Sequence, residues 1–187
     1  MQINIMAKPS ELKQDIYPCE GAAQKIIDVN TGEVKAVVGK GILRSVGIGS
    51  CVVVVAYNLS RKIGGMAHIM LPGAAPQQSL EKTKYAFDGI EQLLKQMFEA
   101  GANTDETEIC LVGAGNILQK EDDTICDANI ESVTGILEEK DISVIASVLG
   151  GTKRKSVFLN VEDGNISYAE GDEKEKTLWQ TNQYQLS

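Results

Sequence analysis

The chain has 187 residues, of which 43% are hydrophobic and 24% charged, and its net charge at pH 7 is −8. This composition indicates one ordinary folded domain with a buried core rather than a disordered chain. The negative balance argues against binding to nucleic acid, which favours clustered Lys and Arg. No run approaches the roughly 18 apolar residues of a membrane span, and residues 1–10 lack a secretory signal. We therefore expect a cytoplasmic protein without membrane insertion.

Hydrophobic patterning predicts alternating short strands in the first half of the chain. Residues 1–41 form a weakly patterned N-terminal arm, with possible strands at 3–6 and at Val34–Val38. The β-branched run at 52–57 is typical of a strand buried on both faces. Turn residues at 58–61 then lead to a returning strand at 62–71.

Two later segments show helical spacing. Apolar residues recur every three or four positions from Ser79 onward, and Gly101 follows as a C-terminal cap. A second amphipathic helix is predicted after Asp127. Strands are predicted at 109–112, 143–149, 156–161 and 165–169, the last two joined as a hairpin. With a polar tail over 170–187, the pattern predicts an α/β fold, a layered sandwich of mixed β-sheet with flanking helices over 42–169.

One cysteine and the only histidine form the most informative pair. His68 lies seventeen residues after Cys51, and a thiol near neutral pH needs a base such as imidazole beside it. If Tyr57 pairs with Lys62 across the turn, Cys51 lies directly opposite His68, with Cβ atoms roughly 4.5–5.5 Å apart. A slip of one residue would place the two on opposite faces of the hairpin. We predict that Cys51 is a nucleophile and His68 its base.

The residues before Cys51 fit the same chemistry. Gly47 and Gly49 allow positive φ and close approach to a ligand, so the amides of Ser50 and Cys51 are candidates for binding an oxyanion. Ser45 is close enough to hydrogen-bond the imidazole and select which ring nitrogen faces the sulfur. Together these residues provide a nucleophile, a base, an orienting hydroxyl and oxyanion donors.

Other interpretations of these residues are less favoured. An isolated cysteine before an apolar run is usually a core residue. We prefer this structural interpretation for Cys110 and Cys126. For Cys19, the surrounding sequence suggests no residue with which it would act. The glycines at 47 and 49 lack the rest of a nucleotide-binding fingerprint. Four scattered cysteines and one histidine offer no pair at zinc-ligand spacing. We expect free thiols, no cofactor and no metal.

Residues 45–52 and 64–72 resemble the signature of CheD, the chemoreceptor glutamine deamidase family of bacterial and archaeal chemotaxis. Weaker similarity continues through 84–86, 113–115 and 149–164, so that the resemblance spans about 42–168. It implies a layered α/β sandwich related to other cysteine-dependent deamidases. It also implies that specific glutamine side chains on the cytoplasmic part of chemoreceptors are converted to glutamates, which can then be methylated.

By this resemblance the nucleophile is Cys51, the base is His68 and the family's hydroxyl residue is Ser45. The family commonly has threonine at that last position, and serine keeps the oxygen but lacks the methyl group that restricts the rotamer. The implied partners are a chemoreceptor as protein substrate and a CheC-type phosphatase. Two alternatives remain: a weakly catalytic or non-catalytic binding partner of a chemotaxis phosphatase, and a thiol amidohydrolase with another substrate.

Overall fold

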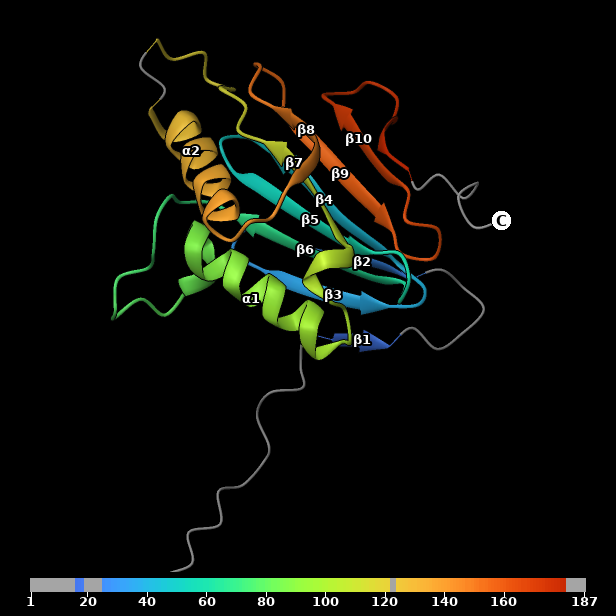
Figure 1. Ribbon diagram of the computed structural model, residues 1–187. Coiled ribbons are helices and arrows are strands. Elements are labelled where there is room, and N and C mark those ends of the chain that lie inside the picture. Colours follow the sequence, from blue (N-terminus) through green and yellow to red (C-terminus); the bar gives the residue numbers. More distant parts are fainter. Residues whose placement is uncertain (1–15, 19–24, 122–123, 181–187) are drawn as a thin grey trace, which may run out of the picture.

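The computed structural model describes residues 16–18, 25–121 and 124–180. The strand predicted at 3–6, Cys19 and the end of the polar tail lie outside the described residues. Within them, two mixed β-sheets and two α-helices form three layers (Figure 1). The helices cover one face of a six-stranded sheet, and a five-stranded sheet packs on its other face. The predicted α/β layered sandwich is confirmed.

Each sheet combines strands that are far apart in the sequence. In spatial order, the six-stranded sheet contains β1 (Ile16–Pro18), β3 (Val34–Val38), β6 (Ile63–Ile69), β5 (Val52–Asn58), β7 (Thr107–Gly113) and β8 (Val144–Leu149). The five-stranded sheet contains β11 (Lys176–Trp179), β10 (Ile166–Glu170), β9 (Lys155–Asn160), β4 (Ile42–Ile48) and β2 (Ile26–Asp28). Helix α1 spans Ala86–Glu99, helix α2 spans Thr124–Glu139, and two single 3₁₀ turns lie at Lys82–Lys84 and Thr104–Glu106.

Strand β5 lies in the middle layer, and all of its residues are buried. Val52 and Val54 pack toward the helices, whereas Val53 and Val55 pack into the core between the two sheets. Because successive side chains point to opposite faces, a strand covered on both sides needs an uninterrupted apolar run. The sequence prediction for this strand is confirmed.

Both predicted helices are present. Helix α1 ends in a Schellman motif, because the Gly101 amide donates to the Phe98 carbonyl and the Ala102 amide to the Met97 carbonyl, each at 2.9 Å. Helix α2 begins before Asp127 and therefore includes Cys126, which is buried. No helix among the described residues is long and apolar enough to cross a membrane.

Four short strands, β1, β2, β3 and β11, lie in the segments predicted as arm and tail, and β3 is the strand predicted at Val34–Val38. Strand β2 pairs in parallel with β4, β3 pairs antiparallel with β6, and β11 extends the five-stranded sheet beside β10. Residues 26–38 thus contribute to both sheets. The division into an arm at 1–41, a domain at 42–169 and a tail at 170–187 stays a prediction.

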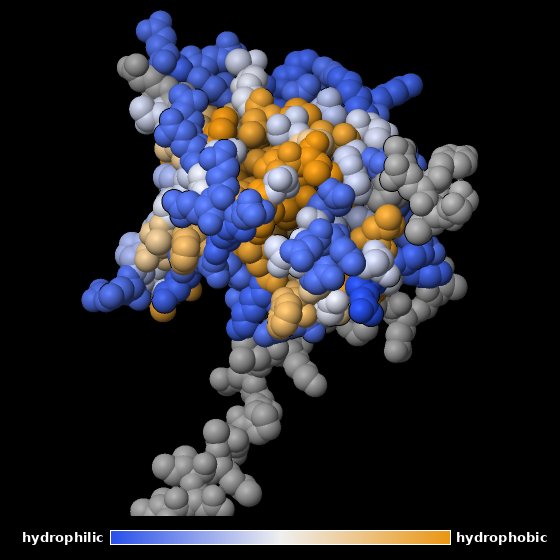
Figure 2. Space-filling model, in the orientation of Figure 1, coloured by the Kyte–Doolittle hydropathy of each residue, from blue (hydrophilic) through white to orange (hydrophobic). Residues whose placement is uncertain are grey.

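Strand β8 forms one edge of the six-stranded sheet. Figure 2 shows hydrophobic side chains gathered in the middle of the face on which Figure 1 places β7 and β8. Ile145 of β8 is 37% exposed. The cavity lined by Cys51 and His68 lies elsewhere, at the end of the sheets where β5 begins and β6 ends.

Candidate active site

The register of the β5–β6 hairpin differs from the prediction. Asn58 pairs with Ile63, so the connecting loop is 59–62, and the partner of His68 is Val53 rather than Cys51. The prediction that Cys51 lies directly opposite His68 is therefore wrong. The cause is Asn58, which stays in the ladder while its side-chain oxygen accepts a hydrogen bond from the Arg61 amide at 3.1 Å.

The error does not change the face of the hairpin on which the two residues lie. The partner of His68 moves by two positions along β5, and an even shift preserves the side to which a side chain points. Val53 belongs to the core between the sheets, and Cys51 packs against that same core. The ladder also continues through Gly64 and Gly65 without a bulge.

Cys51 and His68 line one cavity of about 410 Å³. Its walls come from the ends of β4 and β6, the loop between β4 and β5, the loop after β7, the start of α2, the residue before β9, and the turn between β2 and β3. The predicted residues Gly49 and Ser50 also line it, together with Thr31, Val46, Gly47, Gly115, Asn116, Ile117, Leu118, Lys120, Ile125 and Arg154.

Ser45 holds one end of the His68 ring. The Ser45 hydroxyl oxygen lies 2.8 Å from Nδ1 of His68 and 2.9 Å from the Val29 carbonyl, and Ser45 is only 1% exposed. A hydroxyl has one proton, and here it is donated to the carbonyl, so Nδ1–H must donate to the hydroxyl oxygen. Neutral His68 therefore carries its proton on Nδ1 and presents the lone pair of Nε2.

Burial keeps both candidate reacting groups neutral at rest. It lowers the pKa of His68, an effect opposed by the Val29 carbonyl and by the charge of Glu33. Burial also raises the pKa of the Cys51 thiol, against a smaller opposing hydrogen bond from its own backbone amide. Among the described residues, no hydrogen bond joins Cys51 to His68. The Thr31 hydroxyl instead lies 3.5 Å from Nε2.

The loop that carries Cys51 is held by the end of β7. The Ala114 amide donates to the Cys51 carbonyl and the Gly115 amide to the Gly49 carbonyl, each at 2.7 Å. A Cβ atom on Gly113 would lie 2.2 Å from the Cys51 carbonyl oxygen, so only glycine permits this approach. The glycine turn noted in the sequence thus positions the loop that carries Cys51.

Asn129 of α2 is a further positioning residue that the sequence analysis missed. Its amide nitrogen donates to the Ser50 carbonyl at 2.9 Å and to the Met70 carbonyl at 3.1 Å, which joins the segments beside Cys51 and His68. Asn129 is completely buried. The sequence contains one indication of this role. Asn129 is the polar residue on the buried face of the helix that Cys126, Val133 and Leu137 also form.

The two glycines before Cys51 have different roles. Gly47 has a φ of 69°, as predicted, but Gly49 is not in the left-handed region, so that part of the prediction is wrong. A Cβ atom at Gly49 would make an ordinary van der Waals contact, 3.4 Å from the Ile117 side chain, so packing does not require glycine there. The backbone amide of Cys51 only partly opposes the rise in the pKa of its own thiol. The role of the Ser50 and Cys51 amides as oxyanion donors stays a prediction.

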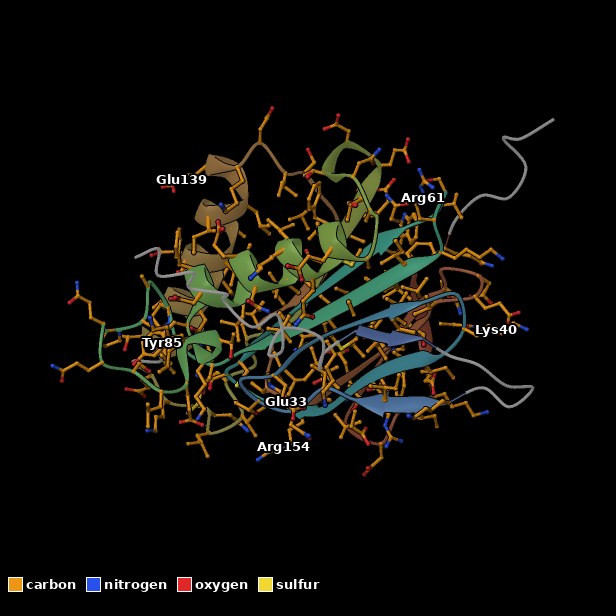
Figure 3. All side chains as sticks on the ribbon, turned by 90° about the horizontal axis from the view of Figure 1, so that it is seen from below. Glu33, Lys40, Arg61, Tyr85, Glu139 and Arg154 are labelled. Carbon is orange, nitrogen blue, oxygen red and sulfur yellow. The ribbon has the colours of Figure 1, made fainter. Side chains whose placement is uncertain are left out.

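The mouth of the cavity combines apolar and cationic groups. Val46 is 54% exposed and Leu118 is 75% exposed. The Arg154 guanidinium donates to the Gly47 carbonyl at 3.1 Å, which fixes it beside the loop that carries Cys51. Figure 3 shows Arg154 and Glu33 in the lower part of the molecule, away from Arg61 and Lys40 at the other end of the strands.

The two other described cysteines lie in the core. Cys110 is fully buried, and burial raises its pKa to about 12. Cys126 is 4% exposed. Their structural interpretation agrees with the sequence analysis.

Comparison with known proteins gives one family. The family model described as CheD chemotactic sensory transduction matches residues 70–170, a range that begins after both Cys51 and His68. "Probable chemoreceptor glutamine deamidase CheD" of Chlorobium luteolum is 34% identical over 150 residues, which cover 80% of this chain and 75% of the relative. "Chemoreceptor glutamine deamidase CheD" of Thermotoga maritima is 29% identical over 143 residues, 76% of this chain and 89% of the relative. The protein of the same name from Halalkalibacterium halodurans is 28% identical over 159 residues, 82% of this chain and 98% of the relative. The chain belongs to the CheD family.

Proposed function

We propose that this protein hydrolytically deamidates specific glutamine side chains on the cytoplasmic part of chemoreceptors, in chemotaxis adaptation, through a thiol mechanism. As a member of the CheD family it is a protein-glutamine glutaminase, and relatives named chemoreceptor glutamine deamidase support a chemoreceptor as the substrate. Such a substrate requires the enzyme to act in the cytoplasm. The observation that carries the mechanism is the cavity shared by Cys51 and His68, with Ser45 fixing the ring.

The first half of the reaction releases ammonia. Nε2 of His68 takes the proton of Cys51, and the thiolate attacks the side-chain carbonyl carbon of glutamine. Backbone amides of the loop that contains Gly49 and Ser50 stabilise the oxyanion. Protonated His68 then gives its proton to the leaving nitrogen, so that ammonia departs and a thioester with Cys51 remains.

The second half regenerates the enzyme. A water molecule gives a proton to His68 while its oxygen attacks the thioester carbon. The bond between carbon and sulfur breaks, and Cys51 leaves as a thiolate that recovers the proton from His68. Glutamate replaces glutamine, and no cofactor or metal enters either half.

The cavity mouth supports a glutamine that is part of a protein surface. Exposed apolar side chains such as Val46 and Leu118 offer contacts to residues beside the glutamine, which a free amino acid would not use. Arg154 adds a cation at the same rim. A CheC-type phosphatase as a second partner is also part of the proposal, and it rests on the family resemblance alone.

Co-expression with a chemoreceptor tests the proposed function. Each modified glutamine should gain about one dalton in a peptide mass spectrum, because an amide becomes an acid. Cys51→Ala should abolish this gain and leave the fold intact, since it removes a sulfur atom and no backbone donor. Cys110→Ala is the matched control, because that buried thiol lies outside the cavity. Full modification by the Cys51→Ala protein would refute the thiol mechanism.

A further inference from the structure

Thr31 lies in the turn between β2 and β3, and hydrogen bonds fix this turn against its neighbours. The Gly32 amide donates to the His68 carbonyl at 2.8 Å, and the His68 amide donates to the Glu33 carbonyl at 3.0 Å. From the other side, the Thr83 hydroxyl donates to the Gly32 carbonyl at 2.6 Å. The backbone therefore sets the position of Thr31 relative to His68.

The Thr31 hydroxyl is placed at the reactive nitrogen of the site. Thr31 lines the same cavity as Cys51 and His68, and its oxygen lies 3.5 Å from Nε2. Nδ1 is occupied by Ser45, so Nε2 is the nitrogen that exchanges protons. A separation of 3.5 Å is at the long limit of hydrogen bonding, so the direct contact is weak. A water molecule with shorter hydrogen bonds to both groups would compete well with it.

The two halves of the reaction make different demands on Nε2. In the first half, the proton comes from Cys51, whose sulfur is fixed by the protein. In the second half, the sulfur is bound in the thioester, and the proton comes from a water molecule that must be held near both Nε2 and the thioester carbon. Correct orientation of such a reactant contributes strongly to rate. Among the described residues, the Thr31 hydroxyl is the side-chain group within hydrogen-bond distance of Nε2.

We propose that Thr31 is a catalytic residue of thioester hydrolysis, a role that rests on the proposed function. Its hydroxyl accepts a hydrogen bond from the attacking water, or donates one to it, and holds that water beside Nε2. Nε2 then removes one proton of the water as its oxygen bonds to the carbonyl carbon. Formation of the thioester does not need Thr31, because no water takes part in that step.

Thr31→Val tests this role, because valine keeps the branched shape and loses the hydroxyl. With a chemoreceptor fragment as substrate, we expect a rapid release of one equivalent of ammonia per enzyme, followed by a steady state slower than wild type by about tenfold or more. Intact-mass spectra should show the fragment attached to Cys51. Hydroxylamine, which attacks thioesters without help from a base, should speed turnover of this variant more than that of wild type. Thr31→Ser should restore the steady state.

Thr83→Val is the matched control, since it makes the same exchange at the anchor of the same turn without altering a group beside Nε2. It should leave the ratio of the ammonia burst to the steady-state rate as in wild type. Equal slowing of burst and steady state in Thr31→Val would show a structural role and overturn the inference, as would an unchanged steady state. Absence of ammonia from the wild-type protein would instead overturn the proposed function.

Discussion

At the residue scale, the chemistry depends on the location of a single proton. The Ser45 proton is donated to the Val29 carbonyl, which obliges Nδ1 of His68 to donate and leaves the lone pair of Nε2 for the proposed role as base. Serine makes both contacts from a fully buried position, where packing restricts its rotamer. Burial of Ser45 thus restricts its rotamer, as the methyl group of a threonine would do at an exposed position.

The pKa shifts of the two reacting groups predict the pH dependence of activity. His68 acts as a base only when neutral, so activity is present above its pKa and is lost as the pH falls through it. Burial lowers this pKa below its ordinary value of 6.5 and raises the pKa of Cys51 above 9.0. A plot of kcat/KM against pH for a receptor fragment should therefore fall on the acid side with a midpoint below 6.5. A midpoint above 6.5 would mean that a charged neighbour, and not burial, controls His68.

Sequence reasoning identified the residues that belong to a motif and missed those that act from a distance. Cys51, His68 and Ser45 share a short region with recognisable spacing. The structure places Cys51 and His68 in one cavity, with Ser45 hydrogen-bonded to the His68 ring from a buried position. Thr31 and Asn129 come from a turn and a helix whose local sequence gives no indication of the cavity. Their contacts exist only after the sheets and helix α2 have packed.

At the element scale, helix α2 joins the two segments that carry the reacting groups. Asn129→Ala should lower kcat, because the carbonyls of Ser50 and Met70 would lose their shared donor and the two segments could separate. Leaving buried carbonyls without a donor should also lower the free energy of unfolding by about 1–3 kcal/mol. Denaturant unfolding and ammonia release would measure the two effects.

Gln96→Ala separates catalytic positioning from stability. Gln96 is also a buried helical amide that donates to a strand carbonyl, that of Val34, but it belongs to α1 and does not line the cavity. We expect this variant to lose stability while keeping kcat. If both variants lost stability equally and both kept kcat, Asn129 would have no positioning role.

Elements with strong local patterns were predictable and short or interrupted ones were not. The apolar run of β5 and the spacing of α1 each specify one structure. The apolar pattern of strand β4 is interrupted by Arg44, which pairs with Asp28, and by Ser45 and Gly47, which lie at the candidate site. Strands β2 and β11 are too short for their sequences to indicate a strand, and they form because a neighbouring strand offers hydrogen bonds.

At the scale of the whole molecule, the candidate site bridges the two sheets. Ser45 lies on β4 of the five-stranded sheet, and His68 lies on β6 of the six-stranded sheet. The hydrogen bond between them therefore depends on how the sheets pack. The sequence predicted the layered fold, but the contact across the layers required the structure.

Removal of the Cys51 proton by His68 is tested by the rate at which iodoacetamide alkylates Cys51. Only the thiolate reacts. At pH 7, Cys51 of wild type should react at least about tenfold faster than Cys51 of His68→Gln, because the partly buried Cys51 thiol is otherwise protonated. Well above pH 9.0 the two rates should converge, since the thiolate then forms without a base. Equal rates at pH 7 would contradict the account.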